Sequence, residues 1–252
     1  MLRSHSRPCL FLILVLALGA PLSMSYAQTR ADSCLFMISG EIAPLLIAVV
    51  KKQYAGLNNG KPKSCAQVIA QLDSPGGDIV SAIEIGQFLR QKEIWTIVPT
   101  KATCASACVL AFLGGVRRMD GPGRVGIHRP YGAGLSSSIN ESKGTFTKIN
   151  QSVKKYLDDI NISESLLTAM NSVPPGEIRW LDREQLVALQ IVGSDPVWED
   201  VSDSKLAKRL GISKRELYER QSRASDLCSY SRLRDSLEMV RCSWAIINPT
   251  NR

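Results

Sequence analysis

Short apolar runs alternate with segments of helical periodicity along the first three quarters of the chain. Runs that predict strands cover residues 33–40, 68–73, 94–98 and 125–128. Segments that predict helices cover residues 43–54, 79–89, 106–113, 143–159 and 164–169, with a further short helix beginning at residue 182. Strands and helices in this order are typical of an α/β domain with a parallel sheet, whose ligands bind at the carboxyl ends of the strands.

The first 27 residues have the pattern of a secretory signal peptide. Arg3 and Arg7 precede an apolar run over residues 9–18, and small residues at 25 and 27 suit a cleavage site before Gln28. The run is far shorter than the ~20 apolar residues that span a membrane. We therefore expect a cleaved signal over 1–27, a periplasmic or secreted protein, and no membrane anchor after cleavage.

Cleavage leaves a single histidine, His128, and an even number of cysteines, which in an exported chain favours disulfides. The six are Cys34, Cys65, Cys104, Cys108, Cys228 and Cys242. One close cysteine pair with one histidine is a poor zinc pattern, so we expect no metal and no cofactor. Proximity in the chain favours bonds between the first two, the middle two and the last two cysteines, although the middle pair could also remain as buried free thiols.

Three segments at predicted strand ends carry residues suited to acyl transfer. A Gly76-Gly77 turn follows one strand, Ser106 opens a buried helix, and His128 ends a later strand. Each of the three also has a plain structural explanation as a turn, a helix cap or a structural histidine. Together they suit a serine nucleophile, Ser106, with His128 as its general base. The backbone N–H groups of Gly77 and Ala107 would form the oxyanion hole, because glycine lets the backbone approach a substrate closely.

Ordered motifs resemble the Clp-protease proteolytic-subunit family and its periplasmic relatives, which include signal peptide peptidase A. The matching text is LDSPGG over 72–77, ASA over 105–107 with LAFLGG over 110–115, VGIHRP over 125–130, and WLDREQL over 180–186. The resemblance covers residues 35 to 192. It implies a crotonase-like ββα superhelix over 28–198 and an exported serine peptidase that cuts unfolded or extended peptides beside Gly76. It also implies that copies of the chain can assemble into a homo-oligomer.

The sequence departs from that family in two respects. No ATP-binding loop of the G-x₄-G-K-[ST] type is present, so any peptidase activity is expected to be ATP-independent. The family's third catalytic residue is an acid about fifty residues after the histidine, where this chain has Ile178 with Glu177 beside it. Glu177 is the candidate acid, whereas Asp182 suits a helix cap. A Ser–His dyad remains open, as does a degenerate scaffold that only binds peptides or partner proteins.

Residues 199–252 form a basic extension with 11 Lys and Arg against 8 Asp and Glu. Residues 206–217 partly match a helix-turn-helix, and the whole chain carries a formal charge of +8. Export and the small excess of positive charge argue against nucleic-acid binding. We expect an amphipathic helix pair closed by a Cys228–Cys242 disulfide.

Overall fold

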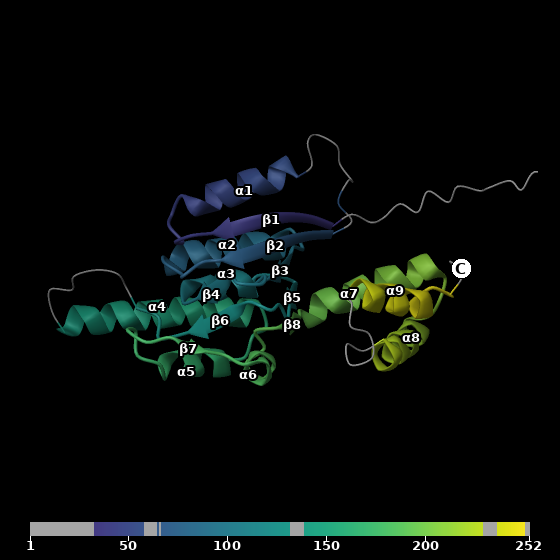
Figure 1. Ribbon diagram of the computed structural model, residues 1–252. Coiled ribbons are helices and arrows are strands. Elements are labelled where there is room, and N and C mark those ends of the chain that lie inside the picture. Colours follow the sequence, from purple (N-terminus) through teal and green to yellow (C-terminus); the bar gives the residue numbers. More distant parts are fainter. Residues whose placement is uncertain (1–32, 58–64, 66, 132–138, 229–235, 250–252) are drawn as a thin grey trace, which may run out of the picture. The chain divides into compact units, whose positions relative to one another are not determined.

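The computed structural model describes residues 33–57, 65, 67–131, 139–228 and 236–249 (Figure 1). The predicted signal peptide over 1–27 lies outside the described residues. Within them, no helix is long and apolar enough to cross a membrane.

The larger sheet has the strand order β1-β2-β3-β5-β8, and its first four strands are parallel. These strands are β1 (Ser33–Ser39), β2 (Gln67–Asp73), β3 (Trp95–Ile97), β5 (Arg117–Met119) and β8 (Gly193–Ser194). The last strand, β8, pairs antiparallel with β5. Phe36, Ile38, Ala70 and Leu72 on β1 and β2 are buried, whereas Leu35 and Met37 are exposed, as expected where alternate side chains point to opposite faces.

The smaller sheet has the order β4-β6-β7, in which β4 and β6 are parallel and β7 is antiparallel to β6. Its strands are β4 (Thr103–Ala105), β6 (Arg124–Ile127) and β7 (Arg179–Trp180). Along the chain β3 and β4 precede one helix and β5 and β6 precede the next, and each pair gives one strand to either sheet. The predicted α/β class with a repeated ββα unit is thereby confirmed.

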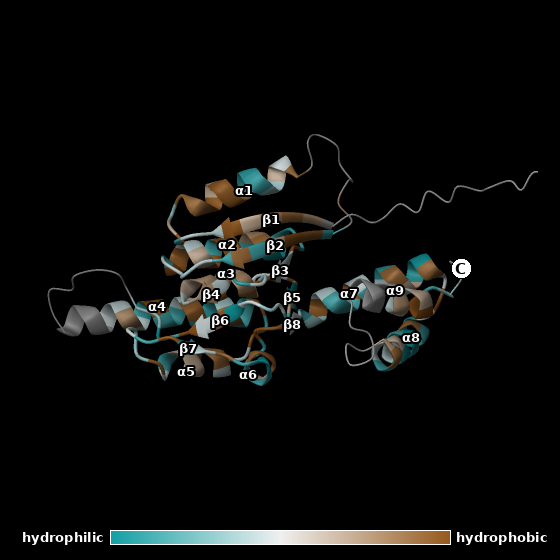
Figure 2. Ribbon diagram, viewed as in Figure 1, coloured by the Kyte–Doolittle hydropathy of each residue, from teal (hydrophilic) through white to brown (hydrophobic). Residues whose placement is uncertain are grey.

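The helices of the first part of the chain match the predicted segments closely. They are α1 (Leu46–Gly56), α2 (Ile79–Gln91), α3 (Ala107–Leu113), α4 (Ile139–Asp159), α5 (Ser165–Asn171) and α6 (Arg183–Ala188). Figure 1 shows α1 beside β1, and in Figure 2 β1 and the first turns of α1 are mainly brown.

Helix α3 lies in the centre of the hydrophobic core, since all seven of its residues are buried. It packs closely on α2, where a Cβ on Gly114 would lie only 2.1 Å from the carbonyl oxygen of Gly86. At its carboxyl end the hydroxyl of Thr96 donates to the Phe112 carbonyl at 2.9 Å. Because its residues are small or apolar, the helix that follows Ser106 can be buried in the core.

The C-terminal part is helical, as predicted. It contains α7 (Pro196–Leu210), α8 (Lys214–Leu227) and α9 (Ser236–Ile247). Gly211 ends α7 in a left-handed conformation with φ 67°, and the Ser213 hydroxyl accepts a hydrogen bond from the first turn of α8. The expected disulfide between Cys228 and Cys242 joins the segments of α8 and α9. Helix α7 is continuous through residue 199, where the sequence predicts the domain boundary.

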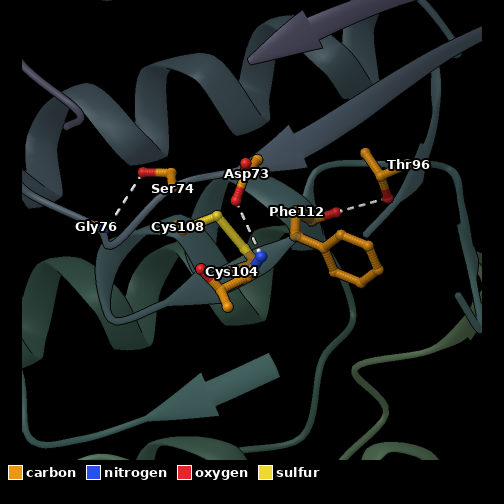
Figure 3. Close-up of a disulfide and its surroundings, with 8 residues drawn as sticks. Asp73, Ser74, Gly76, Thr96, Cys104, Cys108 and Phe112 are labelled. Atoms are coloured by element: carbon orange, nitrogen blue, oxygen red, sulfur yellow. Dashed lines mark hydrogen bonds between the residues drawn. A yellow bond between two sulfur atoms is a disulfide. The ribbon is translucent and has the colours of Figure 1, made fainter. Parts of the chain in front are cut away.

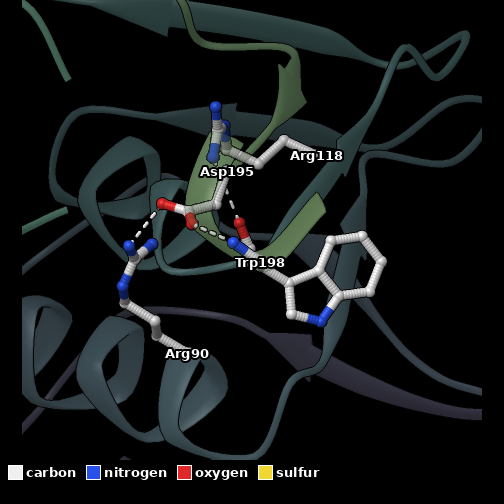
Figure 4. Close-up of polar contacts among 5 residues, drawn as sticks. Arg90, Arg118, Asp195 and Trp198 are labelled. Atoms are coloured by element: carbon white, nitrogen blue, oxygen red, sulfur yellow. Dashed lines mark hydrogen bonds and ion pairs between the residues drawn. The ribbon is translucent and has the colours of Figure 1, made fainter. Parts of the chain in front are cut away.

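Asp195, the residue before α7, has a buried carboxylate that binds two different elements (Figure 4). One oxygen accepts the N–H of Trp198 at 2.8 Å and caps α7, and the other is paired with Arg90 of α2. Burial raises the pKa of Asp195, but the Trp198 N–H and the Arg90 guanidinium outweigh that effect and hold the pKa below its usual value. The buried Arg118 nearby donates to the Ile191 and Gly115 carbonyls, and burial lowers its pKa to about 10.

Candidate active site

Ser106 is the single residue between strand β4 and helix α3, and its backbone is strained. Its φ of 57° and ψ of −129° belong to a region that residues with a Cβ rarely adopt. A serine on a sharp strand-to-helix turn is the arrangement that exposes the hydroxyl of many hydrolase nucleophiles. The Ser106 N–H donates to the Gly126 carbonyl at 3.0 Å, whereas the hydroxyl makes no hydrogen bond to any described residue.

The expected Cys104–Cys108 disulfide spans this turn, with Cα atoms 5.3 Å apart (Figure 3). Cys104 is in the middle of β4 and Cys108 is in the first turn of α3, and both are fully buried. The bond closes a loop of five residues with Ser106 at its centre, so it restrains the backbone that carries the hydroxyl. The Cys34–Cys65 bond is also present, so all three pairs expected from proximity are found.

The Gly76-Gly77 turn after β2 lies directly against Ser106. A Cβ on Gly76 would be 2.6 Å from the Ser106 Cβ and 3.0 Å from the Ala107 nitrogen, so no side chain fits there. Gly76 also has a φ of 105°, which glycine tolerates best. The buried hydroxyl of Ser74 accepts the Gly76 N–H at 3.1 Å and holds the turn in place (Figure 3).

The two backbone N–H groups predicted for the oxyanion hole have no hydrogen-bond partner among the described residues. In the part of the chain that the structure describes, no hydrogen bond is made by the N–H of Gly77 or of Ala107. The neighbouring backbone groups are used, because Ile42 donates to the Gly76 carbonyl at 2.7 Å and accepts the Asp78 N–H at 2.7 Å. Free N–H groups on either side of the Gly76–Ser106 contact are available to stabilise an oxyanion.

His128 directly follows β6, the parallel neighbour of β4. Since Ala105 pairs with Gly126, Ser106 and His128 leave adjacent strand ends in the same direction. The imidazole is largely buried, with 6% of the residue exposed, and its Nδ1 is 2.9 Å from the Arg129 carbonyl oxygen. No hydrogen bond joins His128 to Ser106 among the described residues; catalytic hydrogen bonds are often formed only when substrate is bound.

Neither of the two acids considered from the sequence is bonded to the histidine among the described residues. Glu177 is exposed, and its backbone N–H donates to the Pro174 carbonyl at 3.1 Å. Asp182 caps helix α6, because its carboxylate accepts the Gln185 N–H at 2.8 Å and the Gln185 side chain accepts the Asp182 N–H. In the described residues no hydrogen bond or ion pair joins Glu177 or Asp182 to His128.

The sequence did not predict two neighbours of the imidazole, Tyr131 and the Arg129 carbonyl. Tyr131 lies with its ring centroid 5.6 Å from that of His128, and the Arg129 carbonyl is bonded to the ring itself. The motif that contains His128 could have indicated Arg129 as a neighbour but not where its carbonyl points.

Other candidate sites do not involve these residues. Among the described residues no group of three His, Cys, Asp or Glu side chains could hold a metal ion. A hollow of about 630 Å³ on α7 is lined by Ser202, Lys205, Lys208 and Arg209. This hollow contains neither Ser106 nor His128.

No family model and no curated protein matches the chain. Among solved structures, ClpP1 from Listeria monocytogenes is 17% identical, with a TM-score of 0.47, over 65% of this chain and 90% of that one. A point mutant of the same protein is 18% identical with the same TM-score and coverage. A mutant of the membrane-bound stomatin-specific protease 1510-N is 17% identical, with a TM-score of 0.45, over 64% of this chain and 78% of that one. Identities and TM-scores this low carry no information about the chemistry of this chain.

Proposed function

We propose that this protein is a serine hydrolase with Ser106 as nucleophile and His128 as general base. The observation that carries the proposal is the strained Ser106 turn with a free N–H on each side, from Gly77 and Ala107. Backbone strain persists only where the surrounding structure enforces it, and it is concentrated at functional sites.

The reaction follows from the arrangement. The Ser106 hydroxyl oxygen attacks the substrate carbonyl carbon while its proton passes to Nε2 of His128. The negative charge that develops on the carbonyl oxygen is stabilised by the N–H groups of Gly77 and Ala107. His128 then protonates the leaving group, and a water molecule repeats the attack on the acyl-serine and releases the product.

We favour a peptide as the substrate, because the motifs around Ser106 and His128 resemble those of the Clp-protease family. An extended chain could approach the backbone of Gly76 closely, because glycine has no side chain, and this suits a peptide of variable sequence. Export is supported by three disulfides, since disulfides persist in oxidising compartments. The proposal includes no membrane anchor on the mature chain, no nucleic-acid partner, no cofactor, and assembly of identical copies.

Labelling with a fluorophosphonate probe tests the proposal, because the probe reacts with an activated serine hydroxyl. We expect wild-type protein to be labelled at one site, and Ser106→Ala and His128→Gln to be unlabelled. Ser213→Ala is the matched control, since Ser213 caps the exposed start of α8 and should leave labelling unchanged.

Two results would contradict the catalytic proposal. If folded wild-type protein is not labelled, the chain is instead a scaffold that binds peptides or partner proteins. If Ser106→Ala is labelled as fast as wild type, another serine is the nucleophile. Mass spectrometry of the labelled peptide identifies the residue in either case.

A further inference from the structure

We infer that the backbone carbonyl of Arg129 does for His128 what a carboxylate does in a serine–histidine–aspartate triad, so that Arg129 is a positioning residue. The inference rests on the proposed function of Ser106 and His128. It assigns the third position of the site to a main-chain oxygen rather than to Glu177.

The contact between the imidazole and the carbonyl fixes the tautomer of the ring. Nδ1 of His128 is 2.9 Å from the Arg129 oxygen, and a carbonyl oxygen can only accept a hydrogen bond. Nδ1 must therefore carry the proton, and in the neutral ring Nε2 keeps its lone pair. That is the tautomer a general base needs in order to take the proton of Ser106.

The direction of this carbonyl is held by local and tertiary restraints. Arg129 precedes Pro130, which restricts the Arg129 backbone to extended conformations. Its N–H donates to the Val173 carbonyl at 2.9 Å, and its guanidinium Nε donates to the Asn171 carbonyl at 3.1 Å. Asn171 is in turn bonded to Asn150 of α4 at 2.8 Å. The carbonyl is thus fixed from both the backbone and the side chain of its own residue.

The difference between a carbonyl and a carboxylate has a predictable consequence. Both orient the ring and select the tautomer, but the neutral carbonyl gives a weaker hydrogen bond to the imidazolium that forms during catalysis. Glu177, which is exposed and has no hydrogen bond to the ring among the described residues, should then contribute little.

The tautomer can be measured directly on the full chain labelled with ¹⁵N-histidine. We expect the His128 signals at alkaline pH to show a protonated Nδ1 and an unprotonated Nε2, with His128→Gln identifying them beside the signals of His5. Free imidazole side chains in water prefer the opposite tautomer. A protonated Nε2 in the wild-type protein would overturn the inference, even if the fluorophosphonate probe labels Ser106.

Variants at the positioning residue test its effect on catalysis. Arg129→Ala removes the bond to Asn171, and we expect part of the tautomer signal to shift and kcat to fall about tenfold with KM unchanged. A tenfold loss equals about 1.4 kcal/mol, which is near the worth of one hydrogen bond. Arg129→Lys keeps a donor at this place and should restore part of kcat, and the melting temperature of each variant shows that the fold is retained.

The matched comparison is Glu177→Gln. We expect this variant to keep the wild-type tautomer and kcat. A large loss of kcat in Glu177→Gln, with Arg129→Ala near wild type, would assign the role to Glu177 and overturn the inference. Absence of labelling in a wild-type protein that has the expected tautomer would overturn the proposed function, and with it the catalytic use of the carbonyl, while the hydrogen bond itself stands.

Discussion

The substitution Asp195→Asn should destabilise the fold strongly, although the two side chains are nearly equal in size. Only 2% of the Asp195 side chain is exposed, and its carboxylate is paired with Arg90 and caps α7 through the Trp198 N–H. An asparagine oxygen can still accept the Trp198 N–H, so this change removes the charge and keeps the cap.

The magnitude follows from the burial of the pair. Removing one partner of a fully buried ion pair costs ~3–5 kcal/mol, because the other charge is left without compensation. Arg90 is 24% exposed and can regain some water, which places the expected loss at the lower end of that range, about 3 kcal/mol. For a chain of this size that corresponds to a drop in melting temperature of roughly 6–12 °C.

Urea unfolding at pH 7 measures the free energy of unfolding. Asp159→Asn is the matched control, since Asp159 pairs with Lys155 on the exposed surface of α4 and should lose less than about 1 kcal/mol. Equal losses in the two variants would refute the argument that burial gives the Asp195 pair its strength.

The same comparison predicts a pH dependence. The pKa of Asp195 lies below its usual value in the folded protein, so the carboxylate contributes stability above the unfolded pKa of about 3.9. That contribution is lost as the pH falls through the folded pKa. The stability of wild type should therefore approach that of Asp195→Asn in acid, and a difference that does not shrink below pH 4 would contradict the assignment.

Two further predictions concern the Ser106 turn. Replacing Cys104 and Cys108 together by alanine should slow fluorophosphonate labelling about tenfold and cost about 2 kcal/mol of loop-closure stabilisation. The same change at Cys228 and Cys242 should leave the labelling rate unchanged. Equal labelling rates in the two variants would show that the Cys104–Cys108 disulfide does not position Ser106. Gly76→Ala should stop labelling, because the added Cβ would lie 2.6 Å from the Cβ of Ser106. Gly56→Ala should be labelled at the wild-type rate, because a Cβ on Gly56 would have no atom within 4 Å. Normal labelling of Gly76→Ala would refute the close approach of Gly76 to Ser106.

The sequence by itself determined the features that depend on neighbouring residues. Alternating strand and helix patterns predicted the α/β class, and proximity predicted the Cys104–Cys108 and Cys228–Cys242 disulfides, which left Cys34 and Cys65, 31 positions apart, as the remaining pair. The cap at Asp182 was also predicted, because a capping box involves residues only three apart. Strands β4, β5, β7 and β8 were missed, since two or three residues are too few to show a periodicity; β3 is equally short but lies within the apolar run over 94–98.

Only the tertiary structure decided the features that join distant segments. Gly76 and Ser106 are thirty residues apart, and their contact, the strain at Ser106 and the free N–H groups arise from the packing of β2 against β4. The partner of the His128 ring is a backbone oxygen, which has no signature in the sequence because every residue carries one. The pairing of Asp195 with Arg90 spans 105 positions, and its strength depends on burial that periodicity cannot report. Side-chain patterns report which face of an element is buried, but only the packed chain determines which groups meet there.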